Sequence, residues 1–192
     1  MTTTSPAPAT ATATATARTR RPKRRRLIAL GVIAALLAGY AAWTNLRPFT
    51  LRASIEIDAT PQQVWAVLSD LPAYSQWNPF IVSSSGRLEK GATLRNVMRD
   101  SGGDTTFTPT VLEAAPGREL RWIGRIGPGG IFDGEHRFLI EPVSPGRVRL
   151  TQSERFTGVV IPFFRHQLNE RTLPQFRALN TALAQRVGAT RP

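Results

Sequence analysis

The sequence contains no cysteine and only two histidines among its 192 residues. The missing thiols exclude a disulfide framework, a cysteine-based metal site and a cysteine nucleophile. The motifs of several enzyme classes are also absent. There is no Gly-x-Ser-x-Gly elbow and no His-Glu-x-x-His zinc motif, and the glycine-rich run 127–130 lacks the Lys-Ser/Thr of a phosphate loop. We therefore expect neither a metal ion nor another cofactor.

The positive charge is concentrated near the N-terminus of a chain whose formal net charge is +12. Residues 1–17 form a Thr/Ala/Pro-rich run without charged or aromatic side chains, and seven Lys and Arg residues follow within 18–26. Such a composition cannot bury enough apolar surface to fold, so we predict that 1–26 is a disordered tail. The basic run has no interleaved aromatic side chains, which argues against nucleic-acid binding.

The segment that follows the basic run has almost no polar side chains. No charged residue occurs in 27–43, and the apolar run extends to Leu46. At ~1.5 Å per residue, a helix of this length covers about 25–30 Å, which is enough to cross the hydrocarbon core of a bilayer. Tyr40 and Trp43 lie where an interfacial aromatic belt is expected. We therefore predict a transmembrane helix over 27–46.

The basic cluster also predicts the orientation of this helix, because positively charged flanks stay in the cytoplasm. We predict a single-pass protein of the cell membrane with a cytoplasmic N-terminus and an extracytoplasmic domain over 48–192. One alternative is a cleaved signal peptide, for which Gly39-Tyr40-Ala41 is a loose cleavage site and which would give a secreted protein. The other alternative is a soluble amphiphilic helix.

The residue pattern of the rest of the chain predicts one strand, two short helices, a series of strands and a long final helix. Residues 49–57 alternate in polarity as a strand does, and Thr60-Pro61-Gln62-Gln63 has the capping residues of a helix start. A second short helix fits 73–76. Strand patterns bounded by turn residues then recur at 80–84, 93–99, 105–113, 119–124 and in a hairpin over 130–156. A long helix from about 162 to 187 closes the chain, with a kink or restart expected at Pro174 and an inward stripe of Leu168, Thr172, Phe176, Leu179, Asn180 and Leu183.

The hairpin carries the residues with the most informative chemistry. Alternate side chains of a strand share a face, so His136 and Glu154 both lie on the apolar face of their strands. Antiparallel pairing places His136 opposite Gln152 or Glu154. A buried carboxylate needs hydrogen-bond partners or water. The pair is therefore either a structural contact that fixes the register of the strands or the polar spot of a cavity.

The order of these elements predicts an α+β fold with a bent antiparallel sheet of about seven strands wrapped on the long C-terminal helix. That order, the segment from Ser54 to Trp65 and the Trp77-Asn78-Pro79-Phe80 turn resemble the START-like helix-grip superfamily, also called SRPBCC or polyketide cyclase/dehydrase-like. The resemblance spans roughly 50–188. The segments Gly134–Phe138 and Glu154–Gly158 are similar to those of its membrane-anchored bacterial branch.

This resemblance implies a cavity between the sheet and the long helix that binds apolar small molecules such as lipids, sterols or polyketides. Apolar walls with a few convergent polar groups are also what a ligand site needs on chemical grounds. Any one of the aromatic side chains equally fits an ordinary core. The predicted ligand-binding residues are Trp77, Phe80, Asn96, Met98, Trp122, Phe132, His136, Phe138, Gln152, Glu154 and Phe176.

Three functions fit this pattern. The first is membrane-tethered binding, transfer or sensing of a hydrophobic small molecule or lipid. The second is a cyclase, dehydratase or hydrolase with His136 as general base and Glu154 orienting it; no further motif supports this, so we favour a non-enzymatic role. The third is a protein-interaction module with a closed cavity, whose basic face would meet an acidic partner or anionic lipid headgroups through Arg147, Arg149 and Arg155. The sequence indicates neither the ligand nor the oligomeric state.

Overall fold

A computed structural model of the chain describes residues 1–2, 21–100 and 102–190. The chain divides into two compact units, Met1–Ala38 and Gly39–Pro192, which we describe separately. Most of the predicted disordered tail lies outside the described residues.

Helix α1 spans Arg21–Leu46 and therefore begins inside the basic cluster, earlier than the predicted start at residue 27. Alanine and leucine, the two strongest apolar helix formers, fill much of it. The part Lys23–Leu46 has the length and composition of a membrane span or of a signal sequence, and its large apolar side chains are exposed. The apolar segment predicted at 27–46 is thus helical along its whole length.

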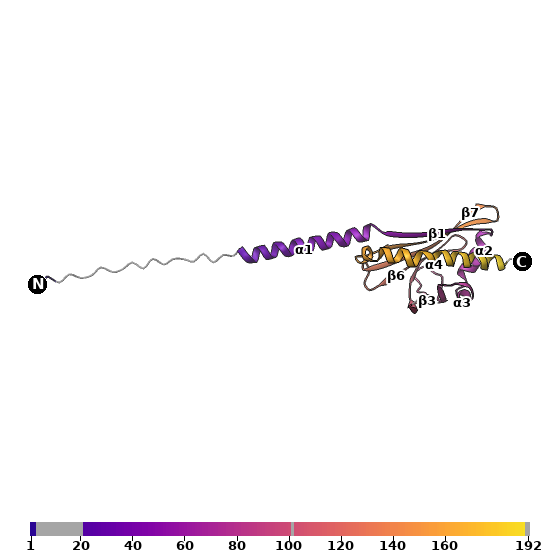
Figure 1. Cartoon of the computed structure of the whole chain (residues 1–192), viewed down its shortest axis with the longest axis horizontal. Coiled ribbons are helices and arrows are strands. Elements are labelled where there is room, and N and C mark those ends of the chain that lie inside the picture. Colours follow the sequence, from indigo (N-terminus) through magenta and orange to yellow (C-terminus); the bar gives the residue numbers. More distant parts are fainter. Residues whose placement is uncertain (3–20, 101, 191–192) are drawn as a thin grey trace. The chain divides into compact units, whose positions relative to one another are not determined.

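Within the described residues, the strands form two antiparallel sheets. The larger sheet has the order β1-β8-β7-β6-β5, and the smaller sheet has the order β2-β3-β4. Figure 1 labels β1, β6 and β7 of the larger sheet and β3 of the smaller sheet. The strands are β1 (Phe49–Ile57), β2 (Ile81–Ser85), β3 (Arg95–Asp100), β4 (Gly103–Phe107), β5 (Thr110–Ala115), β6 (Glu119–Ile126), β7 (Phe132–Ser144) and β8 (Arg147–Thr157).

The single strand predicted over 105–113 is wrong, because the chain changes sheets in its middle. Strand β4 ends at Phe107 and pairs with β3, whereas β5 begins at Thr110 and pairs with β6. Pro109 lies between them and has no N–H to give to a strand ladder; its carbonyl oxygen accepts the Leu94 N–H at 2.9 Å. The expected sheet of about seven strands is therefore two sheets with eight strands in the part of the chain that the structure describes.

The short helices after β1 are those predicted. Helix α2 (Pro61–Ser69) starts with a complete capping box: the Thr60 hydroxyl accepts the Gln63 N–H, and the Gln63 side chain accepts the Thr60 N–H. A 3-10 turn, η1 (Leu71–Ala73), and α3 (Tyr74–Trp77) follow. Local capping chemistry thus fixes where this helical segment begins.

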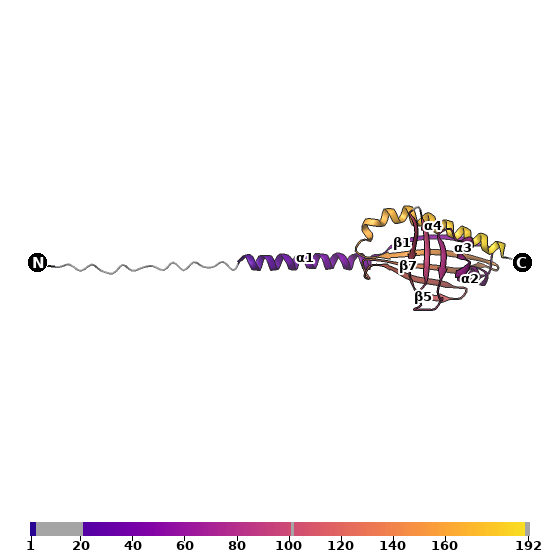
Figure 2. The same cartoon turned by 90° about the horizontal axis from the view of Figure 1, so that it is seen from below.

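The C-terminal helix α4 (Ile161–Ala189) is continuous although it contains Pro174. Proline removes one hydrogen bond of the helix ladder, and Figure 2 shows that α4 bends midway along its length. The predicted kink is therefore confirmed, whereas the predicted restart does not occur. Helix α4 lies across one face of the strands (Figure 2), which confirms the α+β helix-grip fold.

The main core lies between the larger sheet and the helices α2 and α4. Leu68 of α2, Leu120 of β6, Leu150 of β8 and Leu183 of α4 are among its fully buried members. Burial of one leucine side chain contributes about 1.5–3 kcal/mol, so this cluster holds α4 against the sheet. A second, smaller cluster contains Leu51, Ala53, Phe156, Ile161 and Phe176.

The stability of the domain depends on pH through Glu119, which lies at the start of β6. Its buried carboxylate pairs with Arg137 at 2.8 Å and with Arg121 at 3.0 Å. Burial raises the pKa of this group, but the hydrogen bond from Arg137 and the nearby guanidinium charges hold the pKa below its usual range. Because the pKa is lowered by folding, the carboxylate stabilises the domain above the unfolded-state pKa of about 4.3. That stabilisation is lost as the pH falls through the folded-state pKa.

We expect Glu119→Gln to be less stable than the wild type at neutral pH and to approach it as the solution is acidified. Urea unfolding midpoints between about pH 7 and pH 3 measure this convergence. Glu89→Gln, at an exposed position, is the matched control and should keep the wild-type pH dependence. A constant difference between Glu119→Gln and the wild type at every pH would contradict the assignment.

Candidate ligand-binding site

The hairpin of β7 and β8 positions the polar residues of the site. Its register places His136 directly opposite Glu154 and Phe138 opposite Gln152, as one of the two predicted pairings requires. His136 and Gln152 are buried, and Glu154 is half-buried. Because alternate residues of a strand share a face, all these side chains point to the side that α4 covers.

Both ring nitrogens of His136 are engaged by neighbouring side chains. Nδ1 lies 3.4 Å from Oε2 of Glu154, and Nε2 lies 3.0 Å from the amide nitrogen of Gln152. The Gln152 amide donates to Nε2, so the proton of a neutral imidazole is on Nδ1 and is donated to Glu154. The carboxylate thereby fixes the tautomer of the histidine.

Aromatic rings enclose the rest of the imidazole. Trp122 stacks on it with the ring centroids 5.0 Å apart and the planes at 10°. Phe176 of α4 meets it edge-on at 5.0 Å, and Phe138 lies at 4.8 Å. The histidine is therefore a rigid part of the wall.

A cavity of about 180 Å³ lies next to this cluster, between α4 and the strands of both sheets. Most of its wall is apolar, and β3, β7 and β8 each contribute polar groups. The Ser84 hydroxyl donates to Oδ1 of Asn96 at 2.7 Å and so orients the Asn96 amide. The lining residues are Phe80, Ile81, Asn96, Met98, Phe107, Trp122, Phe132, His136, Gln152, Glu154, Phe156, Leu168, Thr172 and Leu179. We call this space the inner cavity.

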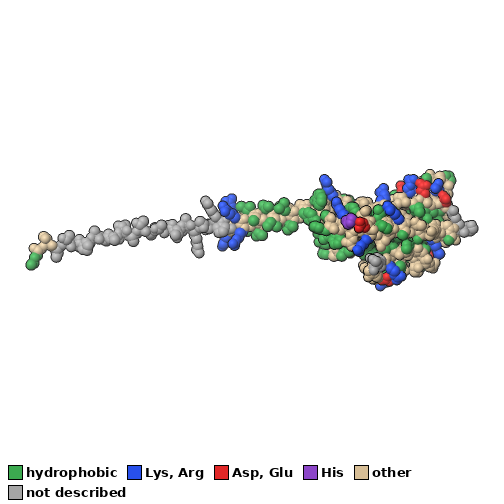
Figure 3. Space-filling view, in the orientation of Figure 1, with side chains coloured by type: hydrophobic (Ala, Val, Ile, Leu, Met, Phe, Trp, Pro, Cys, Tyr) green, Lys and Arg blue, Asp and Glu red, His purple; other side chains and the backbone are tan. Residues whose placement is uncertain are grey.

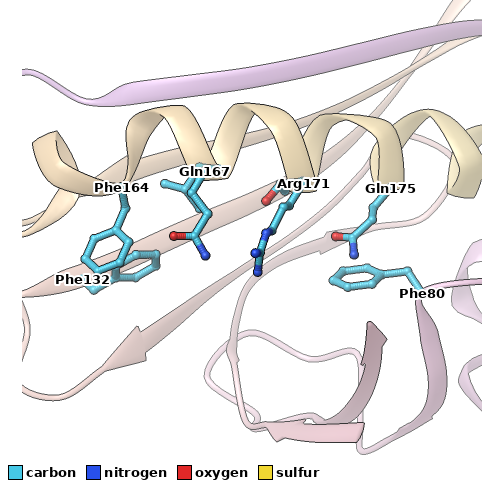
Figure 4. Close-up of a pocket in the computed structure, with 8 residues that line it drawn as sticks. Phe80, Phe132, Phe164, Gln167, Arg171 and Gln175 are labelled. Atoms are coloured by element: carbon cyan, nitrogen blue, oxygen red, sulfur yellow. The ribbon is translucent and has the colours of Figure 1, made fainter. Parts of the chain in front are cut away.

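A wider groove of about 490 Å³ adjoins the inner cavity. The two spaces share Phe80, Phe132, Leu168 and Thr172 as lining residues. The groove is completed by Phe164, Gln167, Arg171 and Gln175 of α4, and Figure 4 shows the last three projecting from the helix toward the side of Phe80 and Phe132. We call this space the outer groove.

The two spaces carry opposite charges. The Glu154 carboxylate lines the inner cavity, and the Arg171 guanidinium lines the outer groove. Among the residues that the structure describes, no group of three or more His, Asp or Glu side chains is arranged to hold a metal ion. The site offers hydrogen-bond and ion-pair contacts on an apolar background.

Most of the predicted site residues line the inner cavity: Phe80, Asn96, Met98, Trp122, Phe132, His136, Gln152 and Glu154. Phe138 and Phe176 are fully buried behind His136 and do not reach it. Trp77 lies elsewhere, in a separate hollow that it shares with Asp70 and Arg186. Its ring packs edge-on against Tyr74 at 5.0 Å, because α3 turns it away from the cavity. The position of Trp77 therefore does not support its predicted role.

Sequence patterns did not identify several lining residues that the fold brings to the site, among them Phe107 and Arg171. Phe107 ends β4 just before the change of sheets, which no alternation pattern reveals. Arg171 belongs to the polar positions of α4, which ordinarily face water. Leu168 and Thr172 also line the site. They lie on the predicted inward stripe of α4, and this stripe is the sequence feature that indicates their position.

Two paired glycines leave space for side chains of the site. Gly124 of β6 lies opposite Gly134 of β7. A Cβ atom on Gly134 would come within 2.5 Å of Oε1 of Glu154, and the Phe107 ring occupies the space beside Gly124. The absence of side chains at these two positions is what allows Glu154 and Phe107 to lie close against the sheet.

Residues 48–188 match a family profile described as "Polyketide cyclase / dehydrase and lipid transport". No curated protein sequence matches the chain. The match covers the whole domain and leaves out only the N-terminal segment and the last residues.

Several solved structures have a similar fold. An aromatase/cyclase, Zhui, from Streptomyces sp. R1128 is 15% identical with a TM-score of 0.61, over 74% of this chain and 94% of its own. A START superfamily protein from Mycobacterium smegmatis is 23% identical with a TM-score of 0.57, over 74% and 99%. Norcoclaurine synthase from Thalictrum flavum, in complex with dopamine and hydroxybenzaldehyde, is 10% identical with a TM-score of 0.60, over 76% and 90%. At these identities the likeness concerns the fold alone.

Proposed function

Because the chain belongs to the polyketide cyclase/dehydrase and lipid transport family, we propose that it binds a hydrophobic small molecule or lipid for transfer or sensing at a membrane. Residues 27–46 are its single-pass anchor, with the N-terminus in the cytoplasm and the domain outside it, since the basic cluster precedes the apolar segment. The observation that carries the proposal is the apolar inner cavity with polar groups at one spot.

The size of the two spaces suggests how a ligand is placed. Typical ligand pockets have about 300–1,000 Å³, whereas a cavity of roughly 150 Å³ holds a single benzene. The inner cavity, at about 180 Å³, therefore suits one ring or a short chain. The rest of a larger ligand extends into the outer groove of about 490 Å³.

The polar groups of the inner cavity favour a ligand that donates a hydrogen bond. The Glu154 carboxylate only accepts hydrogen bonds, and Oε1 of Gln152 is buried without a partner. A ligand hydroxyl satisfies either oxygen, whereas a ligand carboxylate is repelled by Glu154. We infer a hydroxylated apolar ligand whose hydroxyl enters first, with any anionic group left near Arg171 in the outer groove.

Catalysis by His136 has less support than binding. A general base needs a ring nitrogen free to accept a proton from the substrate. Here Glu154 and Gln152 occupy both nitrogens, and the aromatic rings hold the imidazole in place. A substrate would have to displace Gln152 before a proton could reach Nε2.

Ion pairs within the domain also argue against the alternative of a protein-interaction module with a basic face. Arg149 pairs with Glu56 at 2.9 Å, and Arg147 lies 3.3 Å from both Glu56 and Asp58. These two guanidinium groups already have carboxylate partners within the domain. Arg155 alone is a small basis for recognition of an acidic partner.

The test is to look for the ligand and then to weaken its contact. We expect native mass spectrometry of the full chain, extracted from membranes in mild detergent, to show a co-purifying apolar molecule that carries a hydroxyl. The ligand identified in this way should bind Glu154→Gln about tenfold more weakly, the equivalent of ~1.4 kcal/mol for a charged hydrogen bond. Glu141→Gln, exposed on the same hairpin, is the matched control and should bind like the wild type.

The alternatives give different results in the same experiment. A catalytic pair predicts that the bound molecule is converted on incubation and that Glu154→Gln stops the conversion while binding persists. A wild-type chain that carries no small molecule, and takes up none from mixed lipid extracts, would overturn the binding proposal.

A further inference from the structure

One end of the domain carries an exposed apolar surface. Its members are Ile126, Ile131, Phe163 and Phe164, which we call the apolar tip. Their residue exposure reaches 79% at Phe163 and 63% at Ile126. Among the described residues of 48–190, the one other exposed large apolar side chain is Val143, in the distant β7–β8 turn region. Figure 3 shows hydrophobic side chains gathered over the end of the domain where α4 begins.

Backbone hydrogen bonds hold the two parts of the apolar tip together. The connection from β6 to β7 carries Ile126 and Ile131, and the start of α4 carries the two phenylalanines. The Val160 N–H donates to the carbonyl oxygen of Ile131 at 3.3 Å, and the Phe163 N–H donates to that of Val160 at 3.1 Å. The apolar tip is therefore built into the fold and is not a set of loose side chains.

The last turns of α1 contact the same end of the domain. The Tyr40 hydroxyl donates to the carbonyl oxygen of Val159 at 2.8 Å, and the Asn45 amide donates to that of Gly130 at 3.4 Å. Thr44 is buried, with 4% of its surface exposed. Val159 and Gly130 are direct neighbours of the segments that carry the apolar tip. The chain thus enters the domain beside this surface.

We propose that the apolar tip inserts into the interface of the bilayer that carries the anchor, so that the membrane is a docking surface of the domain. This inference rests on the proposed anchoring by residues 27–46. Exposed apolar side chains gathered at one end of a domain are costly in water and mark an interaction site. Exposed Arg47 and Arg165 lie at this end and suit anionic headgroups; Arg165 sits 5.6 Å above the Phe49 ring.

Docking in this way places the ligand entrance at the lipid. Phe164 belongs both to the apolar tip and to the wall of the outer groove, where its ring lies 6.3 Å from that of Phe132. A molecule dissolved in the leaflet then reaches the groove without crossing bulk water. The inner cavity fills from the membrane side.

The absence of cysteine makes a direct test simple, because a single introduced thiol takes a single fluorophore. The full-length variants Phe163→Cys, Ile126→Cys, Val143→Cys and Ile33→Cys are labelled separately and reconstituted in phosphatidylcholine/phosphatidylglycerol vesicles. Quenching by doxyl-labelled lipid reports contact with the bilayer, and quenching by iodide reports contact with water. Val143→Cys is the matched control on the domain, and Ile33→Cys reports on the anchor.

We expect doxyl lipid to quench the labels at 163 and 126 at least about twofold more than the label at 143, with the reverse order for iodide. If the label at 33 is quenched by lipid while those at 163 and 126 behave like that at 143, the docking proposal is overturned and the anchor stands. If lipid quenches none of the four labels, the anchoring itself fails, and the docking proposal fails with it.

Discussion

Replacing Gly158 with alanine is expected to destabilise the domain by about 3 kcal/mol or more, with a fall in Tm of roughly 10 °C. The residue has a φ of 126°, which side chains with a Cβ rarely adopt. A Cβ at this position would also collide with the carbonyl group of Ile131 and lie 2.9 Å from the Phe132 nitrogen. It would thereby break the contact between the β8–α4 corner and the start of β7, where Val160 is bonded to Ile131.

The matched control separates backbone strain from collision. Gly146 also has a positive φ, of 74°, but nothing lies within 4 Å of a Cβ built on it. Gly146→Ala should cost only about 1 kcal/mol. Thermal unfolding of both variants in the same detergent gives the comparison, and equal losses of stability would show that the corner at Gly158 tolerates a side chain.

The second large effect is expected at Thr172, which lies where the inner cavity meets the outer groove. Thr172→Trp should weaken ligand binding by about 100-fold or more, because the indole fills the passage and closely packed walls cannot move to make room. The free energy of unfolding should change little, since the ring enters existing space. Titration of the co-purifying ligand into wild type and variant measures the loss.

Thr181→Trp provides the control for this substitution on the same helix. Thr181 is exposed and lines a hollow on another side of the domain, with Arg52 and Arg177. The Thr181→Trp variant should bind the ligand like the wild type. Unchanged binding by Thr172→Trp would mean that the ligand occupies a site other than the inner cavity.

The local part of the site was predictable because it depends on short-range rules. Strand alternation places His136 and Glu154 on one face, and antiparallel pairing places His136 opposite Gln152 or Glu154; the register shows that the partner is Glu154. The Thr60 capping box and the bend in α4 likewise follow from local chemistry. These features need no knowledge of distant parts of the chain.

The rest depended on long-range packing. The change of sheets at Pro109 decides that Phe107 lines the cavity, and no pattern in the flanking strands announces it. The direction of Trp77 depends on how a four-residue helix is seated, so its helical phase could not be derived. The volume of the inner cavity depends on how far α4 lies from the two sheets. Their strands come from parts of the chain that are distant in sequence from α4 and from each other.

The junction between the apolar helix and the domain has a consequence for how the proposed ligand would be passed on. Arg47 and Pro48 alone separate the end of α1 from the start of β1, and the Arg47 N–H is bonded to the carbonyl oxygen of Trp43 at 3.0 Å. If residues 27–46 anchor the domain in a membrane, as we propose, two residues are too short a linker for the domain to carry a bound ligand across an aqueous gap. An acceptor of that ligand would then have to come to the membrane.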